Sequence, residues 1–317
     1  MQNSSNTLTV SLIIPTYNRA SLLPNAIDSV LTQTRVPDEI IVVDDGSTDN
    51  TIKVLEPYQP RVKVLRQTNQ GPSASRNSGL RAATGDLIAF LDSDDTLTTD
   101  SVEKRASLLE HYAEYDVVYS NVMMTELSGR PLGLFTQAFP GVRPSGSVFY
   151  QVAQNHLMAI HGFMFRRSCL DIVGLFDETL SSSVDYDFWV RMACHCSFLF
   201  LDEPLAHYRV HEGMMTAGQR SARWSNYLRV IRQIQTMPAF EQLTPVQKSV
   251  VCCKHGIANM LGHNGREARR LFAQAIKVHP MSPRGYLLLG LSMTGYRTFA
   301  FVHGIRRRAR GDLILLK

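Results

Sequence analysis

The feature that most constrains the fold is a set of short apolar runs that each end directly in a polar cluster. Three such clusters follow in order: Pro15-Thr16-Tyr17-Asn18, Asp44-Asp45-Gly46-Ser47 and Asp92-Ser93-Asp94-Asp95. The runs alternate with segments of helical periodicity, which is typical of a mostly parallel sheet with helices on both faces. Ligands bind beyond the carboxyl ends of the strands in such sheets. We therefore expect the three clusters to meet in one crevice.

The first two thirds of the chain carry the expected elements. Strands are expected at 10–14, 39–43, 62–65, 87–91, 117–120, 198–201 and 206–209, and helices at 20–31, 72–83 and 185–196. Residues 129–146 are rich in Gly, Pro and Phe and predict a mobile loop.

The C-terminal third differs from the rest in charge and in pattern. Residues 1–215 carry 16 Lys and Arg against 25 Asp and Glu, a net of −9, whereas residues 216–317 carry 17 against 3, a net of +14. Such asymmetry favours an anionic partner for the C-terminal segment, such as phospholipid, pyrophosphate or nucleic acid. From about residue 218 the pattern is helical, and 258–289 resembles one tetratricopeptide-like helix pair. Because one such unit cannot bury its apolar face alone, we expect it to pack on the preceding domain.

The end of the chain predicts contact with a membrane surface. Residues 286–305 are apolar except for Arg297 and His303, and they lead into the basic run 306–310. Arg297 near the centre would cost ~2.5–3.5 kcal/mol in a membrane span, so an interfacial or core-packed helix pair is expected. Basic clusters bind anionic lipid at about 1 kcal/mol per residue. The N-terminus lacks signal-peptide features. We expect a cytoplasmic protein, peripheral at the inner face of the membrane; a merely solvated basic face is the alternative.

The five cysteines form neither an even disulfide framework nor paired CxxC motifs. Cys194 and Cys196 flank His195, and Cys252-Cys253 precedes His255, so a zinc site is the alternative. Their apolar, helix-like surroundings favour buried free thiols.

The acidic cluster after the fourth strand predicts a divalent-cation site. Asp92 and Asp94 lie two residues apart directly after the apolar run 87–91. Mg²⁺ and Mn²⁺ accept carboxylate oxygens together with phosphate oxygens of a substrate. Such a metal offsets the charge that develops on a departing diphosphate. An isolated Asp-x-Asp also occurs in solvated turns, but its place at a strand end favours the metal.

Four ordered blocks resemble the nucleotide-binding half of family 2 glycosyltransferases with the GT-A fold: 10–19, 39–49, 74–79 and 85–95. The second-half pattern of that family follows at 173–177, 185–191 and 208–211. The resemblance covers about 8–215. It implies a GT-A α/β catalytic domain over 1–215, with a nucleotide-sugar half at about 8–120 and an acceptor half at about 121–215. Residues 216–317 form a basic helical region outside it.

The resemblance implies six donor-binding residues: Pro15, Thr16, Tyr17, Asp44, Arg76 and Asp92. The first three would lie along the base, Asp44 would hydrogen-bond the pyrimidine, and Asp92 would contact the ribose. The Arg76 guanidinium would reach base or phosphate. A strand-end turn at 15–17 and a surface ion pair of Arg76 are the simpler alternatives.

Two metal ligands are implied by the same resemblance. Asp94 would bind Mn²⁺ or Mg²⁺, and His211 would complete the metal shell unless it is a structural histidine. Asp95 would either assist or act as an N-cap of the next helix.

The resemblance implies Asp185 as the catalytic base, which removes the acceptor hydroxyl proton in an inverting reaction. Many family members have Glu before this aspartate, where this chain has Val184. Asp187 is the competing base, although its i,i+4 spacing to Arg191 predicts an ion pair. Trp189 is expected in the core, with a wall of the acceptor pocket as the alternative.

The implied function is transfer of a hexose or N-acetylhexosamine from a UDP-sugar to a glycan or lipid-linked acceptor in cell-surface polysaccharide synthesis. Residues 120–190, including 135–146 and His156 or His161, would shape the acceptor site. A nucleotidyltransferase is the enzymatic alternative, but the glycine- and lysine-containing loop expected after the first strand is missing. A nucleotide-sugar-binding module without catalysis is the other alternative. A nucleic-acid partner is not expected, since it would leave the acidic half unexplained.

Overall fold

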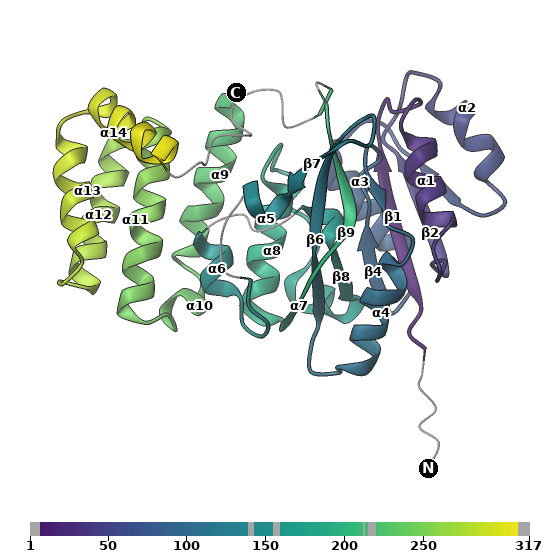
Figure 1. Ribbon diagram of the computed structural model, residues 1–317, viewed down its shortest axis with the longest axis horizontal. Helices are drawn as coiled ribbons and strands as arrows, with labels where there is room; N and C mark the ends of the chain where they lie inside the picture. Colours follow the sequence, from purple (N-terminus) through teal and green to yellow (C-terminus); the bar gives the residue numbers. More distant parts are fainter. Residues whose placement is uncertain (1–6, 139–142, 155–158, 212, 215–219, 310–317) are drawn as a thin grey trace, which may run out of the picture. The chain divides into compact units, whose positions relative to one another are not determined.

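The computed structural model describes residues 7–138, 143–154, 159–211, 213–214 and 220–309 (Figure 1). Contacts divide the chain into two compact units. The sheet unit comprises 1–137, 143–147 and 158–218, and the helical unit comprises 138–142, 148–157 and 219–317. The helical unit therefore includes α6 (Phe149–Gln154) from within the first 215 residues. A functional division at residue 215 stays a prediction.

The sheet unit contains one nine-stranded sheet. Its strands are β1 (Val10–Thr16), β2 (Glu39–Asp44), β3 (Lys63–Arg66), β4 (Leu87–Phe90), β5 (Thr96–Leu97), β6 (Val117–Glu126), β7 (Pro131–Leu134), β8 (Phe163–Arg166) and β9 (Phe198–Val210). The order is β3-β2-β1-β4-β8-β6-β9-β5, with β7 on β6. Strands β3, β2, β1 and β4 are parallel, whereas β8 runs antiparallel to β4 and β6. The α/β fold class is confirmed, and the sheet becomes mixed beyond β4.

Helices flank this sheet: α1 (Leu23–Leu31), α2 (Thr51–Leu55), α3 (Pro72–Ala82), α4 (Ser101–His111), α5 (Phe135–Ala138), α7 (Leu170–Val173) and α8 (Val184–His195), with 3₁₀ turns η1 (Glu56–Tyr58), η2 (Ile160–Gly162) and η3 (Arg167–Cys169). Helix α3 packs on β1 and β2, and α4 on β6 and β8. Strand β1 is buried along its whole length. A Cβ at Gly79 would lie 2.4 Å from Cγ2 of Ile13, so the glycine lets α3 approach β1 closely.

The helical unit contains α6, α9 (Arg220–Ile234), α10 (Pro238–Glu241), α11 (Pro245–Leu261), α12 (Gly265–Val278), α13 (Pro283–Met293) and α14 (Tyr296–Ala309). Helix α11 packs on α12 and α12 on α13, so that these helices lie side by side (Figure 1). A capping box of Thr244 and Gln247 starts α11. The predicted single helix pair at 258–289 is therefore wrong in its bounds, because residue 258 lies inside α11. No helix in the described part of the chain is long and apolar enough to cross a membrane.

Two further expectations need correction. The predicted loop at 129–146 contains β7 and α5. Strand β7 forms because it pairs antiparallel with β6, and the register of this pairing shifts between Met124 and Thr125. The two strands expected at 198–201 and 206–209 are one strand, β9. Polar residues and Pro204 interrupt its apolar pattern, but register shifts against β6 accommodate them.

Candidate active site

The three polar clusters meet at the carboxyl edge of the neighbouring parallel strands β2, β1 and β4, as the sequence predicts. Asn18 joins the first two clusters, since its backbone N–H donates to Ser47 Oγ at 2.9 Å and its side-chain Oδ1 accepts from Thr48 N at 2.8 Å. Arg19 joins the first cluster to the third, with Nε 3.6 Å from Asp94 Oδ2. The three clusters are thus joined by contacts between residues far apart in the chain.

The second cluster contributes two carboxylates with different contacts. Asp44 is fully buried; its Oδ1 accepts from Ser47 N, and its Oδ2 lies 3.3 Å from Arg66 Nε. Asp45, to which the sequence assigned no role, accepts from Gln67 Nε2 at 2.8 Å and from Gly71 N at 2.8 Å. Asp45 therefore fixes the loop that leads into α3. Its only sequence signal is its position next to Asp44.

The residues of the first cluster differ in exposure. Pro15 and Thr16 are buried in β1, whereas Tyr17 is 44% exposed. Thr16 Oγ1 is buried without a hydrogen-bond partner. Of the three, Tyr17 presents the side chain that is most open to a ligand.

Arg76 and Asp92 form an ion pair at the same strand edge. Arg76 extends from α3, is only 7% exposed, and its Nη2 lies 2.8 Å from Asp92 Oδ1. Its guanidinium lies over the Phe176 ring, 5.7 Å from the centroid. Its Nε is buried without a hydrogen-bond partner. The simpler alternative, an ion pair of Arg76, is present; its Arg76 side chain is 8% exposed and its Asp92 side chain 30% exposed.

Asp94 and His211 lie in direct contact. His211 Nε2 is 3.2 Å from Asp94 Oδ2, and the two side chains are 10% and 19% exposed. Arg209, two residues before His211 on β9, donates through Nε to the Asp94 carbonyl oxygen. The carboxylate and the imidazole that the sequence assigned to the metal are thus brought together at a partly open position.

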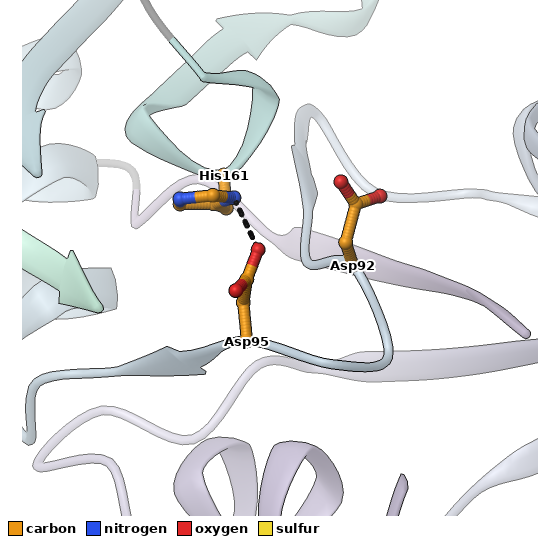
Figure 2. Close-up of side chains that lie close together, drawn as sticks. All are labelled: Asp92, Asp95 and His161. Carbon is orange, nitrogen blue, oxygen red and sulfur yellow. Dashed lines mark ion pairs between the residues drawn. The ribbon is translucent and has the colours of Figure 1, made fainter. Parts of the chain in front are cut away.

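Asp95 forms a second, deeper pair (Figure 2). Its Oδ2 lies 3.1 Å from His161 Nδ1, and its Oδ1 accepts from Arg209 N at 2.7 Å. Burial raises the pKa of the Asp95 carboxyl, although His161 opposes the shift. Burial opposes protonation of His161, but Asp95 prevails and raises its pKa. The N-cap role for Asp95 is wrong, because α4 begins at Ser101 with Asp100 at the N-cap.

Two sets of donor atoms could hold a metal. Within the described ranges, the group of three carboxyl and imidazole side chains with ligand atoms within 4.8 Å of one another is Asp92, Asp95 and His161. Carboxylate oxygens suit Mn²⁺ and Mg²⁺, and imidazole nitrogens bind several divalent transition metals; Asp94 with His211 offers the same two kinds of ligand. The cysteines are free, and this group contains none of them. Zinc at 194–196 or 252–255 is therefore unsupported in the described chain.

Helix α8 carries the candidate bases. Asp185 lies half-buried in its first turn, after Ser183 in the left-handed region (φ 58°). Asp187 is 4% exposed and accepts from Arg191 Nη2 at 2.7 Å and Nε at 3.0 Å, which confirms the predicted ion pair. Trp189 is buried and stacks on Phe163 with centroids 3.5 Å apart, as expected of a core residue.

Some predicted residues lie beyond what the structure describes. His156 is outside the described residues, as is Arg310 of the basic run. His161, the other histidine named for the acceptor site, is fully buried against Asp95.

Sequence comparison relates the chain to one family. The model of "Glycosyl transferase family 2" matches residues 11–172. An uncharacterized glycosyltransferase of Rickettsia conorii is 33% identical over 213 residues, covering 67% of this chain and 34% of the relative. Another from Rickettsia typhi is 30% identical over 240 residues, covering 72% of this chain and 74% of that protein. The chain thus spans about a third of the length of the Rickettsia conorii protein.

Solved structures share the fold at low sequence identity. The crystal structure of S. aureus TarS in complex with UDP-GlcNAc has a TM-score of 0.66 and 20% identity, covering 95% of this chain and 92% of that one. The mannosyltransferase of Pyrobaculum calidifontis in complex with GDP-Man and Mn²⁺ has a TM-score of 0.59 and 18% identity, covering 93% and 83%.

Proposed function

Because this chain belongs to glycosyl transferase family 2, we propose that it transfers a sugar from a nucleotide diphosphate sugar to a hydroxyl of a glycan or lipid-linked acceptor. The observation that carries the proposal is the contact of Asp94 with His211 beside the Arg76–Asp92 pair at one strand edge. A UDP-hexose or UDP-N-acetylhexosamine is the favoured donor, supported by the UDP-GlcNAc complex of a neighbour with the same fold. The proposed setting is cell-surface polysaccharide synthesis.

The donor would lie across the first two clusters. Tyr17 is exposed beside the buried Pro15 and Thr16, so its ring can contact the base, and Asp44 would accept a hydrogen bond from a pyrimidine. The free Nε of Arg76 provides a buried cationic donor for base or phosphate. Asp92, held by Arg76, would accept from the ribose. We propose residues 1–215 as the catalytic domain, with these residues in its nucleotide-sugar half.

A divalent metal would be held by Asp94 and His211. These side chains are partly open, so a substrate phosphate can reach a shared ion, whereas Asp95 and His161 are almost fully buried. The Mn²⁺ in the mannosyltransferase neighbour supports manganese or magnesium. Such an ion supplies charge stabilisation for the departing diphosphate.

The acceptor proton would go to Asp185. An ionised carboxylate within hydrogen-bond reach of the acceptor hydroxyl removes its proton as the oxygen attacks the anomeric carbon, opposite the diphosphate, so that the configuration inverts. Asp187 is a poorer base because both contacts of its Oδ2 come from the Arg191 guanidinium. Asp185 is half-buried in the first turn of α8, where its Oδ1 accepts from Tyr186 N at 2.9 Å.

A donor panel tests the proposal. Thermal unfolding is followed with Mn²⁺ and UDP-, GDP- or TDP-sugars, and release of the free nucleotide is then measured for each donor that raises the midpoint. We expect a UDP-sugar to raise the midpoint and to be turned over. Stabilisation without turnover on any acceptor would favour a binding module, and pyrophosphate chemistry on a nucleoside triphosphate would favour a nucleotidyltransferase.

We also propose that the helical unit binds an anionic membrane surface at the inner face of the membrane. Residues 268–311 contain no Asp or Glu. In this stretch α13 and α14 expose large apolar side chains, among them Tyr286, Met293 and Phe301. Basic and aromatic residues together favour an interfacial position. Flotation with vesicles containing anionic lipid is expected to fall when 306–310 are replaced by Ser; equal flotation of both proteins would contradict a role for this run.

A further inference from the structure

His161 is a fully buried histidine whose position is fixed from several sides. It lies in η2, just before β8, and its ring stacks on Tyr208 with centroids 5.7 Å apart. The buried Arg105 of α4 donates through Nη1 to the carbonyl oxygens of His161, at 3.0 Å, and Phe163, at 3.1 Å. A guanidinium placed on two carbonyls clamps the turn that carries the imidazole.

The imidazole points at Asp95 rather than at solvent (Figure 2). His161 Nδ1 is 3.1 Å from Asp95 Oδ2, and both side chains are at most 2% exposed. A buried carboxylate costs free energy unless it is paired and hydrogen-bonded. His161 pairs with one oxygen of Asp95 at 3.1 Å, and Arg209 N donates a hydrogen bond to the other.

The pair is connected to the proposed metal residues on both sides. Asp95 follows Asp94 directly in the chain. Arg209 binds Asp95 through its backbone N–H and the Asp94 carbonyl oxygen through its guanidinium, and His211 directly follows the end of β9. Holding Asp95 in place therefore also holds Asp94 in place relative to the end of β9. This keeps Asp94 Oδ2 and His211 Nε2 at their separation of 3.2 Å.

We propose that His161 is a positioning residue for the Asp94–His211 metal pair, acting through the Nδ1–Asp95 contact and not as a ligand. This inference rests on the proposed function, because it assumes that Asp94 and His211 hold the metal. Groups that orient metal ligands typically contribute about 10–100-fold in metal affinity. Loss of the Asp95 contact is expected to weaken Mn²⁺ binding by a factor in this range.

Two substitutions separate the donor from the ring. His161→Phe keeps an aromatic ring that can stack on Tyr208 but removes the N–H. His161→Asn removes the ring but places an amide N–H near the position of Nδ1.

A matched control is His207→Asn, because His207 is a half-buried histidine of β9 whose Nδ1 contacts Thr96 Oγ1 and not Asp95.

Mn²⁺ binding to the full chain is measured without donor by the electron paramagnetic resonance signal of free Mn²⁺, alongside thermal unfolding. We expect His161→Phe to weaken binding about 10–100-fold, and His161→Asn to restore most of the loss. His207→Asn should bind as the wild type does, and Asp94→Asn should lose binding.

Four outcomes would overturn the inference. Unchanged Mn²⁺ affinity in His161→Phe would show that the contact does not position the metal pair. Loss of binding in both His161 variants with retention in Asp94→Asn would make His161 a ligand in the Asp92–Asp95–His161 group. Absence of Mn²⁺ binding by the wild type would remove the assumed metal site itself. If Phe lowers the unfolding midpoint, the comparison of Asn with wild type still decides, because Asn without rescue contradicts the positioning role.

Discussion

Two aspartates, two residues apart on α8, have different surroundings and predict opposite consequences of the same change. Asp187 is buried with both contacts to the Arg191 guanidinium, whereas Asp185 is half-buried at the start of the helix. Asp187→Asn should lower the free energy of unfolding by about 2 kcal/mol, because a charged hydrogen-bonded pair is broken. Asp185→Asn should change stability less than Asp187→Asn does and should lower kcat by about 10²–10⁴. Urea unfolding and turnover of both variants check this; a reversal of the two effects would make Asp187 the base.

Arg76 predicts a change in donor affinity. Arg76 binds Asp92 through Nη2, and its Nε–H has no hydrogen-bond partner and could donate to the nucleotide. Lysine keeps the positive charge but lacks the planar guanidinium that supplies both donors. Arg76→Lys should raise KM for the donor about tenfold, equivalent to ~1.4 kcal/mol, with a smaller change in kcat. Arg81→Lys is the control, because Arg81 is exposed on the same helix and pairs with Glu178. Equal kinetics of the two variants would place Arg76 outside the donor site.

Spacing along the sequence identifies single site residues but does not predict which side chains they contact in the fold. Asp92 and Asp94 could be singled out because they follow an apolar run directly. The partner of Asp95 could not, because His161 lies 66 residues further along the chain and reaches Asp95 only when β8 pairs with β4. Asp45 also appears as a loop anchor only in three dimensions.

At the scale of elements, two glycines of the helical unit predict opposite effects. A Cβ at Gly256 of α11 would lie 2.4 Å from the Phe272 ring of α12, whereas Gly290 of α13 has no atom within 4 Å of that position. Gly256→Ala should destabilise the protein by about 1–3 kcal/mol through overpacking. Gly290→Ala should stabilise it by about 0.5–1 kcal/mol through helix propensity. Chemical unfolding followed by circular dichroism measures both; destabilisation by Gly290→Ala would mean that its surface is covered.

Helix α11 also predicts a pH dependence. Burial lowers the pKa of His255 to about 4, and its Nε2 lies 2.8 Å from the Ala153 carbonyl oxygen of α6. The unfolded chain takes up a proton below about pH 6.5 and the folded chain does not. Stability from this group is therefore complete above pH 6.5 and falls by up to about 3 kcal/mol towards pH 4.

The control for this pH dependence is His255→Gln, which cannot titrate. Unfolding free energies at pH 7.5 and 4.5 are compared between the two proteins, so that the contributions of other groups cancel. A wild-type loss no greater than that of His255→Gln would contradict the buried neutral histidine.

Periodicity predicted most elements of the parallel half but failed where strands are irregular. Strands β1, β2 and β4 are buried apolar runs, so their positions are visible in the sequence. Strand β9 is interrupted by polar residues and Pro204 and is held by its long pairing with β6. Pairing with a neighbouring strand thus keeps β9 continuous, although its local sequence pattern predicts a break.

At the scale of the molecule, charge and fold divide the chain in similar places. The acidic sheet unit carries the proposed site, and the basic helical unit recruits α6 from within the first 215 residues. The sequence located the change in charge near residue 215. It could not show that α6 belongs to the helical unit. The helix is short, and its buried residues Phe149, Val152 and Ala153 form no periodic pattern long enough to assign it to either unit.

The measurement that tests the central claim most directly is the Mn²⁺ dependence of UDP release from a UDP-sugar by the full chain and by Asp94→Asn. Wild-type release should require the metal and fall to background with chelator. Asp94→Asn should lose at least about 10²-fold, since removing one charge-stabilising group typically costs that much in kcat. Release that is unaffected by chelator and equal in Asp94→Asn would contradict a metal-dependent transferase built on Asp94 and His211.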